Sequence, residues 1–113
     1  PNEVSDMNVI GTVANKDIIL IDDIIDTGGT ICKAATIAME RGANSVRAMI
    51  THPVLSGKAY DNINASALTE LIVCNTIPLQ QQSDKIKQLS VATLFATAIR
   101  NVFEHRSVSI LSI

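Results

Sequence analysis

Short runs of aliphatic and β-branched residues recur along the chain, separated by segments of mixed polarity. The first run, IILI within residues 17–22, is apolar at consecutive positions, not at alternate ones. Continuous runs of this kind are typical of strands that are buried on both faces of a parallel sheet. Four such runs predict strands, at residues 17–22, 45–51, 70–75 and 86–89.

Helical spacing appears between these runs. A helix after the first run is predicted by the apolar positions Ile31, Ala34, Ala35 and Ala38, and Gly42 can end it. Residues 58–63 predict a short second helix, Ser90 can cap a longer one, and residues 107–111 predict a last extended segment. The alternation of strands and helices predicts an α/β fold with a mostly parallel sheet and flanking helices.

Composition narrows the class of protein. The 113 residues suit one domain, and their 47% hydrophobic content excludes a disordered segment. No apolar run approaches the roughly 20 residues that a membrane span needs. The net charge of −2 and the few aromatic residues argue against a nucleic-acid partner. Cys32 and Cys74 are isolated and no secretory segment is evident, so a cytoplasmic protein is expected.

The candidate chemistry lies in residues 22–30, DDIIDTGGT, between the first strand and the first helix. Paired glycines flanked by threonines let the backbone of a helix N-terminus approach an anion closely. Carboxylates would repel that anion, but they accept hydrogen bonds from sugar hydroxyls and bind Mg²⁺. An acidic half beside a phosphate-binding half therefore indicates a sugar phosphate as the ligand.

Residues 19–30 resemble the phosphoribosyl-pyrophosphate loop of the type I phosphoribosyltransferase fold, and within it they are most similar to the ribose-phosphate pyrophosphokinases. Three further segments extend this resemblance almost from end to end, at residues 51–57, 85–92 and 104–109. That family transfers the pyrophosphoryl group of ATP to the C1 hydroxyl of ribose 5-phosphate, giving phosphoribosyl pyrophosphate and AMP.

The resemblance implies a role for each residue of the loop. Asp22 and Asp23 would bind the ribose hydroxyls, directly or through Mg²⁺ and water, and Asp26 would lie near the 5-phosphate. The 5-phosphate itself would be bound by Thr27, Gly28, Gly29 and Thr30. Ser107 and Ser109 match serines of a regulatory phosphate or ADP site between subunits, although Ser112 stands where the family often has an aromatic residue.

The resemblance also implies what residues 1–113 do not contain. They correspond to a C-terminal phosphoribosyltransferase-like domain, while the ATP-binding residues, a metal-binding histidine and a mobile catalytic loop belong upstream of Pro1. We therefore expect no catalytic residue here, weak binding of ribose 5-phosphate and no turnover. The family implies a homo-oligomer, which agrees with the excess of aliphatic residues. Two alternatives stay open: a phosphoribosyltransferase and a non-catalytic, synthetase-associated regulatory subunit.

Overall fold

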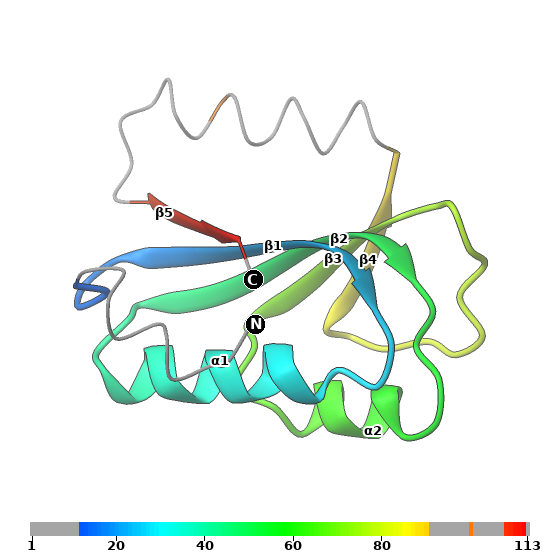
Figure 1. The fold of residues 1–113 in the computed structure, drawn as a ribbon, viewed down its shortest axis with the longest axis horizontal. Helices are drawn as coiled ribbons and strands as arrows, with labels where there is room; N and C mark the ends of the chain where they lie inside the picture. Colours follow the sequence, from blue (N-terminus) through cyan, green and yellow to red (C-terminus); the bar gives the residue numbers. More distant parts are fainter. Residues whose placement is uncertain (1–11, 91–99, 101–107, 113) are drawn as a thin grey trace.

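The computed structural model describes residues 12–90, residue 100 and, as backbone, residues 108–112. Its centre is a five-stranded sheet in which every pair of neighbouring strands is parallel, in the order β4-β3-β2-β1-β5 (Figure 1). The strands are β1 (Asp17–Ile25), β2 (Ser45–Pro53), β3 (Glu70–Cys74), β4 (Ile86–Leu89) and β5 (Val108–Ser112). The predicted fold class is confirmed.

Two helices, α1 (Gly29–Glu40) and α2 (Ala59–Asn64), cover the same face of this sheet (Figure 1). The predicted face of α1 is the buried one, and its three alanines let the helix backbone lie close to the strands. The core between helices and sheet is filled mainly by branched aliphatic side chains, among them Ile18, Leu20, Ile50, Ile63 and Leu71. Burying such side chains stabilises the fold by about 1.5–3 kcal/mol each.

The opposite face of the sheet is also apolar at its centre. Ile19, Met49 and Ile72 form a second buried cluster, with Leu89 packed against it. Because Ile18 and Leu20 point to one face and Ile19 to the other, the middle of β1 is buried on both sides. This confirms the expectation drawn from the continuous apolar run.

The C-terminus of α1 is closed as predicted at Gly42, whose φ of 92° is in the left-handed region. The Gly42 N–H donates to the Met39 carbonyl and the Ala43 N–H to the Ala38 carbonyl, both at 3.1 Å, which is the Schellman pattern. The Gly42 carbonyl then accepts from the Asn15 N–H at 2.9 Å. The end of α1 is thereby fixed to the segment that leads into β1.

One predicted boundary was wrong in a way that matters for the site. The first strand does not end at Asp22, because β1 continues to pair with β2 as far as Ile25, opposite Pro53. The two aspartates therefore lie within a strand that extends beyond the packed core. The helix predicted from Ser90 lies outside the described residues, except for Arg100, which is helical. Among the described helices, none has the length and apolar content to cross a membrane.

Candidate functional site

The predicted loop joins β1 to α1 at the carboxyl edge of the parallel sheet, where open α/β sheets bind ligands. It forms a cavity of about 260 Å³. Most of the residues predicted from the sequence line it together with their aliphatic neighbours: Asp22, Ile24, Ile25, Asp26, Thr27, Gly28, Gly29, Thr30 and Ile31. Asp23 is not part of this lining, although it is the neighbour of a residue that is.

Gly28 precedes the first turn of α1 and adopts a φ of 83°, which disfavours any residue with a Cβ. A Cβ at this position would lie 3.5 Å from Ile63 and 3.6 Å from Ile25, so the backbone is packed against α2 and β1. The first hydrogen bond of α1 runs from the Cys32 N–H to the Gly28 carbonyl at 2.9 Å. No side chain caps this helix N-terminus.

The acidic half of the site is held by its own backbone. The Asp23 N–H donates to Asp22 Oδ1 at 2.8 Å. Partial burial raises the pKa of Asp22 above its ordinary value of 3.8. The negative charge and the side-chain hydrogen bond of Asp23 raise it further, while the Asp23 N–H acts in the opposite direction. The two adjacent carboxyl groups therefore repel each other, which a cation or a hydroxyl donor would relieve.

Asp26 is held by the connection between β2 and α2. Its carboxylate accepts a hydrogen bond from the Ser56 hydroxyl, and its backbone carbonyl accepts from the Ser56 N–H at 3.1 Å. The Leu55 N–H makes an equivalent bond to the Ile25 carbonyl. The carboxylate that follows the strand is thus used, at least in part, to hold the loop in place.

The half of the loop formed by residues 27–30 has one further anchor, on α2. Asn62 Nδ2 donates to the Thr27 carbonyl at 3.0 Å, and the Asn62 carbonyl accepts from the Cys32 thiol at 3.6 Å. Neither Asn62 nor the anchoring role of Ser56 was predicted. Both residues lie at least 30 positions from their partners, and no local pattern distinguishes them.

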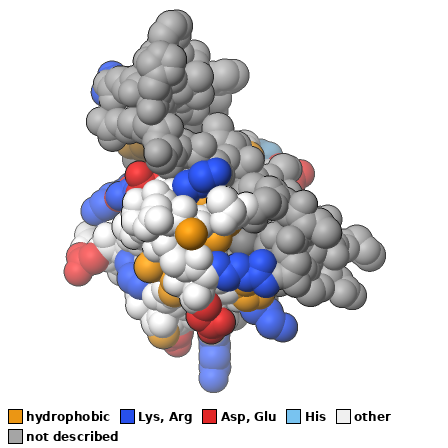
Figure 2. All heavy atoms as spheres, turned by 90° about the vertical axis from the view of Figure 1, so that its left-hand side faces the viewer, with side chains coloured by type: hydrophobic (Ala, Val, Ile, Leu, Met, Phe, Trp, Pro, Cys, Tyr) orange, Lys and Arg blue, Asp and Glu red, His pale blue; other side chains and the backbone are white. Residues whose placement is uncertain are grey.

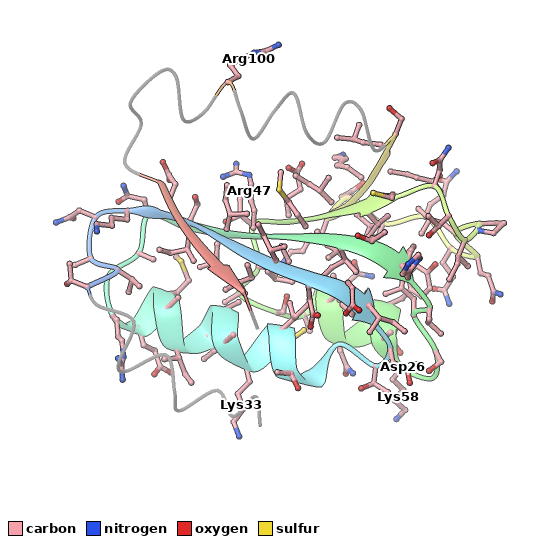
Figure 3. The ribbon with its side chains drawn as sticks, turned by 45° about the horizontal axis from the view of Figure 1, so that its top comes forward. Asp26, Lys33, Arg47, Lys58 and Arg100 are labelled. Atoms are coloured by element: carbon pink, nitrogen blue, oxygen red, sulfur yellow. The ribbon has the colours of Figure 1, made fainter. Side chains whose placement is uncertain are left out.

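Positive charge is sparse around this cavity. In Figure 3, Lys33 points away from the sheet and Arg47 lies at a distance from Asp26, whereas Lys58, at the start of α2, lies at the same end of the molecule as Asp26. None of the three lines the cavity. Among the described residues, the positive potential at this cavity therefore comes mainly from the backbone N–H groups at the start of α1.

Two adjacent carboxylates, those of Asp22 and Asp23, are the side chains here that could bind Mg²⁺. The described residues contain no group of three or more side chains able to hold a metal. Mg²⁺ is commonly bound by one or two carboxylates together with water and substrate oxygens. Asp22 and Asp23 fit that pattern only if the ligand supplies oxygens of its own. The predicted regulatory residues are not tested: Ser107 lies outside the described residues, and Ser109 is described only as backbone, paired with Ile18.

The fold and the site define a parallel α/β domain that presents a helix N-terminus and two carboxylates at one edge of its sheet. The profile of the phosphoribosyl synthetase-associated domain matches residues 1–112. The chain belongs to this family. The resemblance expected from the loop and the three further segments is thereby confirmed.

Similar proteins carry a consistent name. The ribose-phosphate pyrophosphokinase of Wolinella succinogenes is 56% identical over 105 residues, covering 93% of this chain and 34% of that protein. The corresponding protein of Campylobacter jejuni is 54% identical over 112 residues, covering 99% of this chain and 36% of that protein. The chain thus spans about a third of the length of these curated relatives.

A solved structure agrees with the sequence comparison. The crystal structure of phosphoribosylpyrophosphate synthetase from Mycobacterium smegmatis superimposes with a TM-score of 0.68 at 43% identity. The match covers 83% of this chain and 32% of that one. The fold of this chain is therefore shared with that synthetase.

Proposed function

We propose that this chain supplies the ribose-5-phosphate site of a ribose-phosphate pyrophosphokinase. The reaction transfers the pyrophosphoryl group of ATP to the C1 hydroxyl of ribose 5-phosphate and releases AMP. Family membership and the names of the relatives support the reaction. The arrangement of the loop supports the division of labour between its two halves.

One observation carries the phosphate half of this proposal. The first four N–H groups of an α-helix have no acceptor within the helix. In α1 these belong to Gly28, Gly29, Thr30 and Ile31, and all four residues line the cavity. A phosphate there would accept hydrogen bonds from the backbone and from the Thr27 and Thr30 hydroxyls, and the helix dipole would favour its negative charge.

The sugar half follows from the position of the acids. Asp22 lies in the same cavity, so its carboxylate can accept hydrogen bonds from the ribose hydroxyls of a ligand whose phosphate lies at the helix. Asp23, next to it, would act mainly through Mg²⁺ and water. Mg²⁺, when bound, would neutralise negative charge between the carboxylates and the substrate oxygens.

Among the described residues, no Lys, Arg or His lines the cavity, so no cationic side chain there can neutralise a transferring phosphoryl group. Its lining is acidic, hydroxylic or aliphatic. In phosphoryl-type transfer, most of the rate comes from positioning and from cations near the developing charge. We therefore expect the 113-residue chain alone to bind ribose 5-phosphate weakly and to form no phosphoribosyl pyrophosphate.

The experiment is a titration of the isotope-labelled chain with ribose 5-phosphate, followed through its backbone amide resonances. We expect the amides of residues 28–31 to shift most, and ribose without the phosphate to leave them unchanged. Equal shifts with ribose, or shifts confined to other residues, would contradict the proposal. A parallel incubation with ATP and Mg²⁺ should yield no AMP, and turnover would show that this chain supplies more of the active site than proposed.

One alternative from the sequence gains support from a specific observation. Within the described part of the chain, the cavity lining has no Lys, Arg or His, which also suits a non-catalytic regulatory subunit of the synthetase. The two functions differ when the chain is placed in the context of a full-length relative. Exchanging it for the matching third of the Campylobacter jejuni protein should preserve synthesis of phosphoribosyl pyrophosphate if it is a substrate-binding part. It should abolish synthesis if the chain is regulatory.

A further inference from the structure

We infer that Asn62 is a positioning residue for the phosphate-binding loop, whose side-chain amide fixes the orientation of the Thr27–Gly28 peptide. This inference rests on the proposed function, because it concerns how tightly that loop binds a phosphate. Asn62 lies on α2 and lines no part of the cavity. Its effect on the ligand therefore passes through the peptide that it contacts.

The geometry of the Thr27–Gly28 peptide connects the Asn62 amide to the N–H group of Gly28. The Asn62 amide donates to the Thr27 carbonyl at 3.0 Å, so that carbonyl points toward α2. A trans peptide is planar, and its C=O and N–H groups point in opposite directions. The N–H of Gly28 consequently points away from α2. It has no acceptor among the described residues, and Gly28 lines the cavity.

Without this bond the peptide has an alternative. Glycine accommodates both left-handed and right-handed backbone conformations at little cost, so a peptide beside Gly28 can rotate more easily than most. In the rotated state the Thr27 carbonyl would face the cavity and direct its negative end toward a bound phosphate. A donor that holds the carbonyl on the other side removes this state and organises the loop before the ligand arrives.

Two hydrogen bonds hold the backbone of Asn62 in place. Its backbone N–H donates to the Lys58 carbonyl at 2.8 Å, and its carbonyl accepts from the Cys32 thiol on α1. Burial raises the pKa of the Cys32 thiol, which keeps it in the protonated form that can donate. The next residue, Ile63, is fully buried and lies beside Gly28. Helix α2 therefore contacts the loop through one apolar and one polar side chain.

The test compares Asn62→Ala with the matched control Asn64→Ala in the 113-residue chain. Asn64 lies on the same helix and accepts a hydrogen bond from the Ser83 hydroxyl instead of contacting the loop. The probes are inorganic phosphate, ribose 5-phosphate and ribose, each followed by amide resonances. Losing one hydrogen bond should weaken binding of the two phosphate-containing probes roughly 2- to 10-fold in Asn62→Ala. Binding should be unchanged in Asn64→Ala.

Two further measurements separate positioning from a general loss of structure. The amide resonances of residues 27–29 should shift in ligand-free Asn62→Ala, while those of β3 stay in place. Asn62→Gln keeps an amide donor and should recover part of the affinity, which also decides the matter if the alanine variant does not fold.

The outcomes are distinct. Unchanged phosphate affinity in Asn62→Ala, or an equal loss in Asn64→Ala, overturns the role of Asn62 and leaves the proposed function standing. A wild-type chain that binds neither phosphate-containing probe overturns the proposed function and this inference with it. A selective loss in Asn62→Ala, with partial recovery in Asn62→Gln, supports both.

Discussion

The two ends of the parallel sheet carry acidic side chains in contrasting surroundings. At the amino end, Asp17 accepts a hydrogen bond from the Ser45 hydroxyl at 2.8 Å. Arg47 and Glu70 form an ion pair there, with 3.5 Å between Nε and Oε1. At the carboxyl end, Asp22 and Asp23 have only each other within the described structure, and no ion pair is found there. The carboxylates at the amino end have partners within the protein, whereas Asp22 and Asp23 are free to interact with a ligand.

The surface at the amino end carries charges of both signs. Figure 2 shows Lys and Arg side chains interspersed with Asp and Glu over this face, without a patch of one sign. Each of these exposed charges contributes little to stability, and because both signs are mixed, no strong local potential results. At the opposite end, the carboxylate of Asp22 and the positive end of the α1 dipole face the same cavity, so opposite potentials meet there. A ligand with hydroxyls at one end and a phosphate at the other matches that arrangement.

The largest effect is expected from removing both charges at the carboxyl end. Asp22→Asn combined with Asp23→Asn keeps the shape of the side chains but replaces charge-assisted hydrogen bonds by neutral ones. The loss should be about 2–3 kcal/mol of binding free energy for ribose 5-phosphate, or roughly 30- to 150-fold in Kd. Titration calorimetry measures it, with the exposed Asp84→Asn as control. Unchanged affinity would remove the acids from the site.

Next in size is the loss of the glycine conformation at the helix N-terminus. Gly28→Ala should lower the free energy of unfolding by about 1–2 kcal/mol, because φ is 83° while the neighbouring atoms leave room for a Cβ. Gly29→Ala provides the matched comparison, since its Cβ would meet only Thr27 Oγ1, at 3.9 Å. That variant should be no less stable than the wild type. Equal destabilisation of both variants in urea unfolding would contradict this account.

A smaller effect is expected at the amino end, where a substitution should change stability but not ligand binding. Asp17→Ala removes the acceptor of the Ser45 hydroxyl, and Ser45 is 9% exposed. The free energy of unfolding should fall by about 1 kcal/mol, while the Kd for ribose 5-phosphate stays the same. Unfolding and titration on the same preparation test both halves of the prediction. A change in Kd would show that the two ends are coupled.

The smallest effect concerns pH. The pKa of Asp22 is raised above 3.8 in the folded chain. At pH values between 3.8 and this raised pKa, the folded state therefore binds more protons than the unfolded state. Asp22 therefore contributes less to the free energy of unfolding as pH rises through this window. Asp22→Asn should lack this dependence, so its stability relative to the wild type should increase from acidic to neutral pH. A constant difference across the window would mean that Asp22 titrates normally.

Most of the fold could be predicted because its elements are encoded locally. The apolar run around Leu20, the alanine face of α1 and the closing Gly42 each predict one element without reference to distant residues. The end of β1 was misplaced because polar residues such as Asp22 and Asp23 read as the end of a strand. Backbone pairing with β2 continues through them nevertheless. Strand length is set by the partner strand as well as by polarity.

The site, like the fold, could be predicted only where local sequence determines it. The glycines and threonines between β1 and α1 indicate a backbone anion site by their type and spacing alone. The anchors Ser56 and Asn62 reach the loop only because β2 pairs in register with β1 and α2 then returns to the same edge. The sequence alone does not fix that return path. Residues that hold a loop from a distance are for this reason harder to find than residues that form it.

The strand pairing of β1 has one more consequence, for motion. Its described pairing with β5 extends from Asp17 to Ile21, whereas its pairing with β2 extends to Ile25. Among the residues that the structure describes, the acidic segment is thus bordered by a strand on one side only, while the apolar segment before it is bordered on both. Amides of the apolar segment should exchange with solvent only through large-scale opening, and those of the acidic segment on its open side should exchange through local fluctuations. The backbone at the carboxyl edge can therefore adjust to an arriving molecule while the centre of the sheet stays closed.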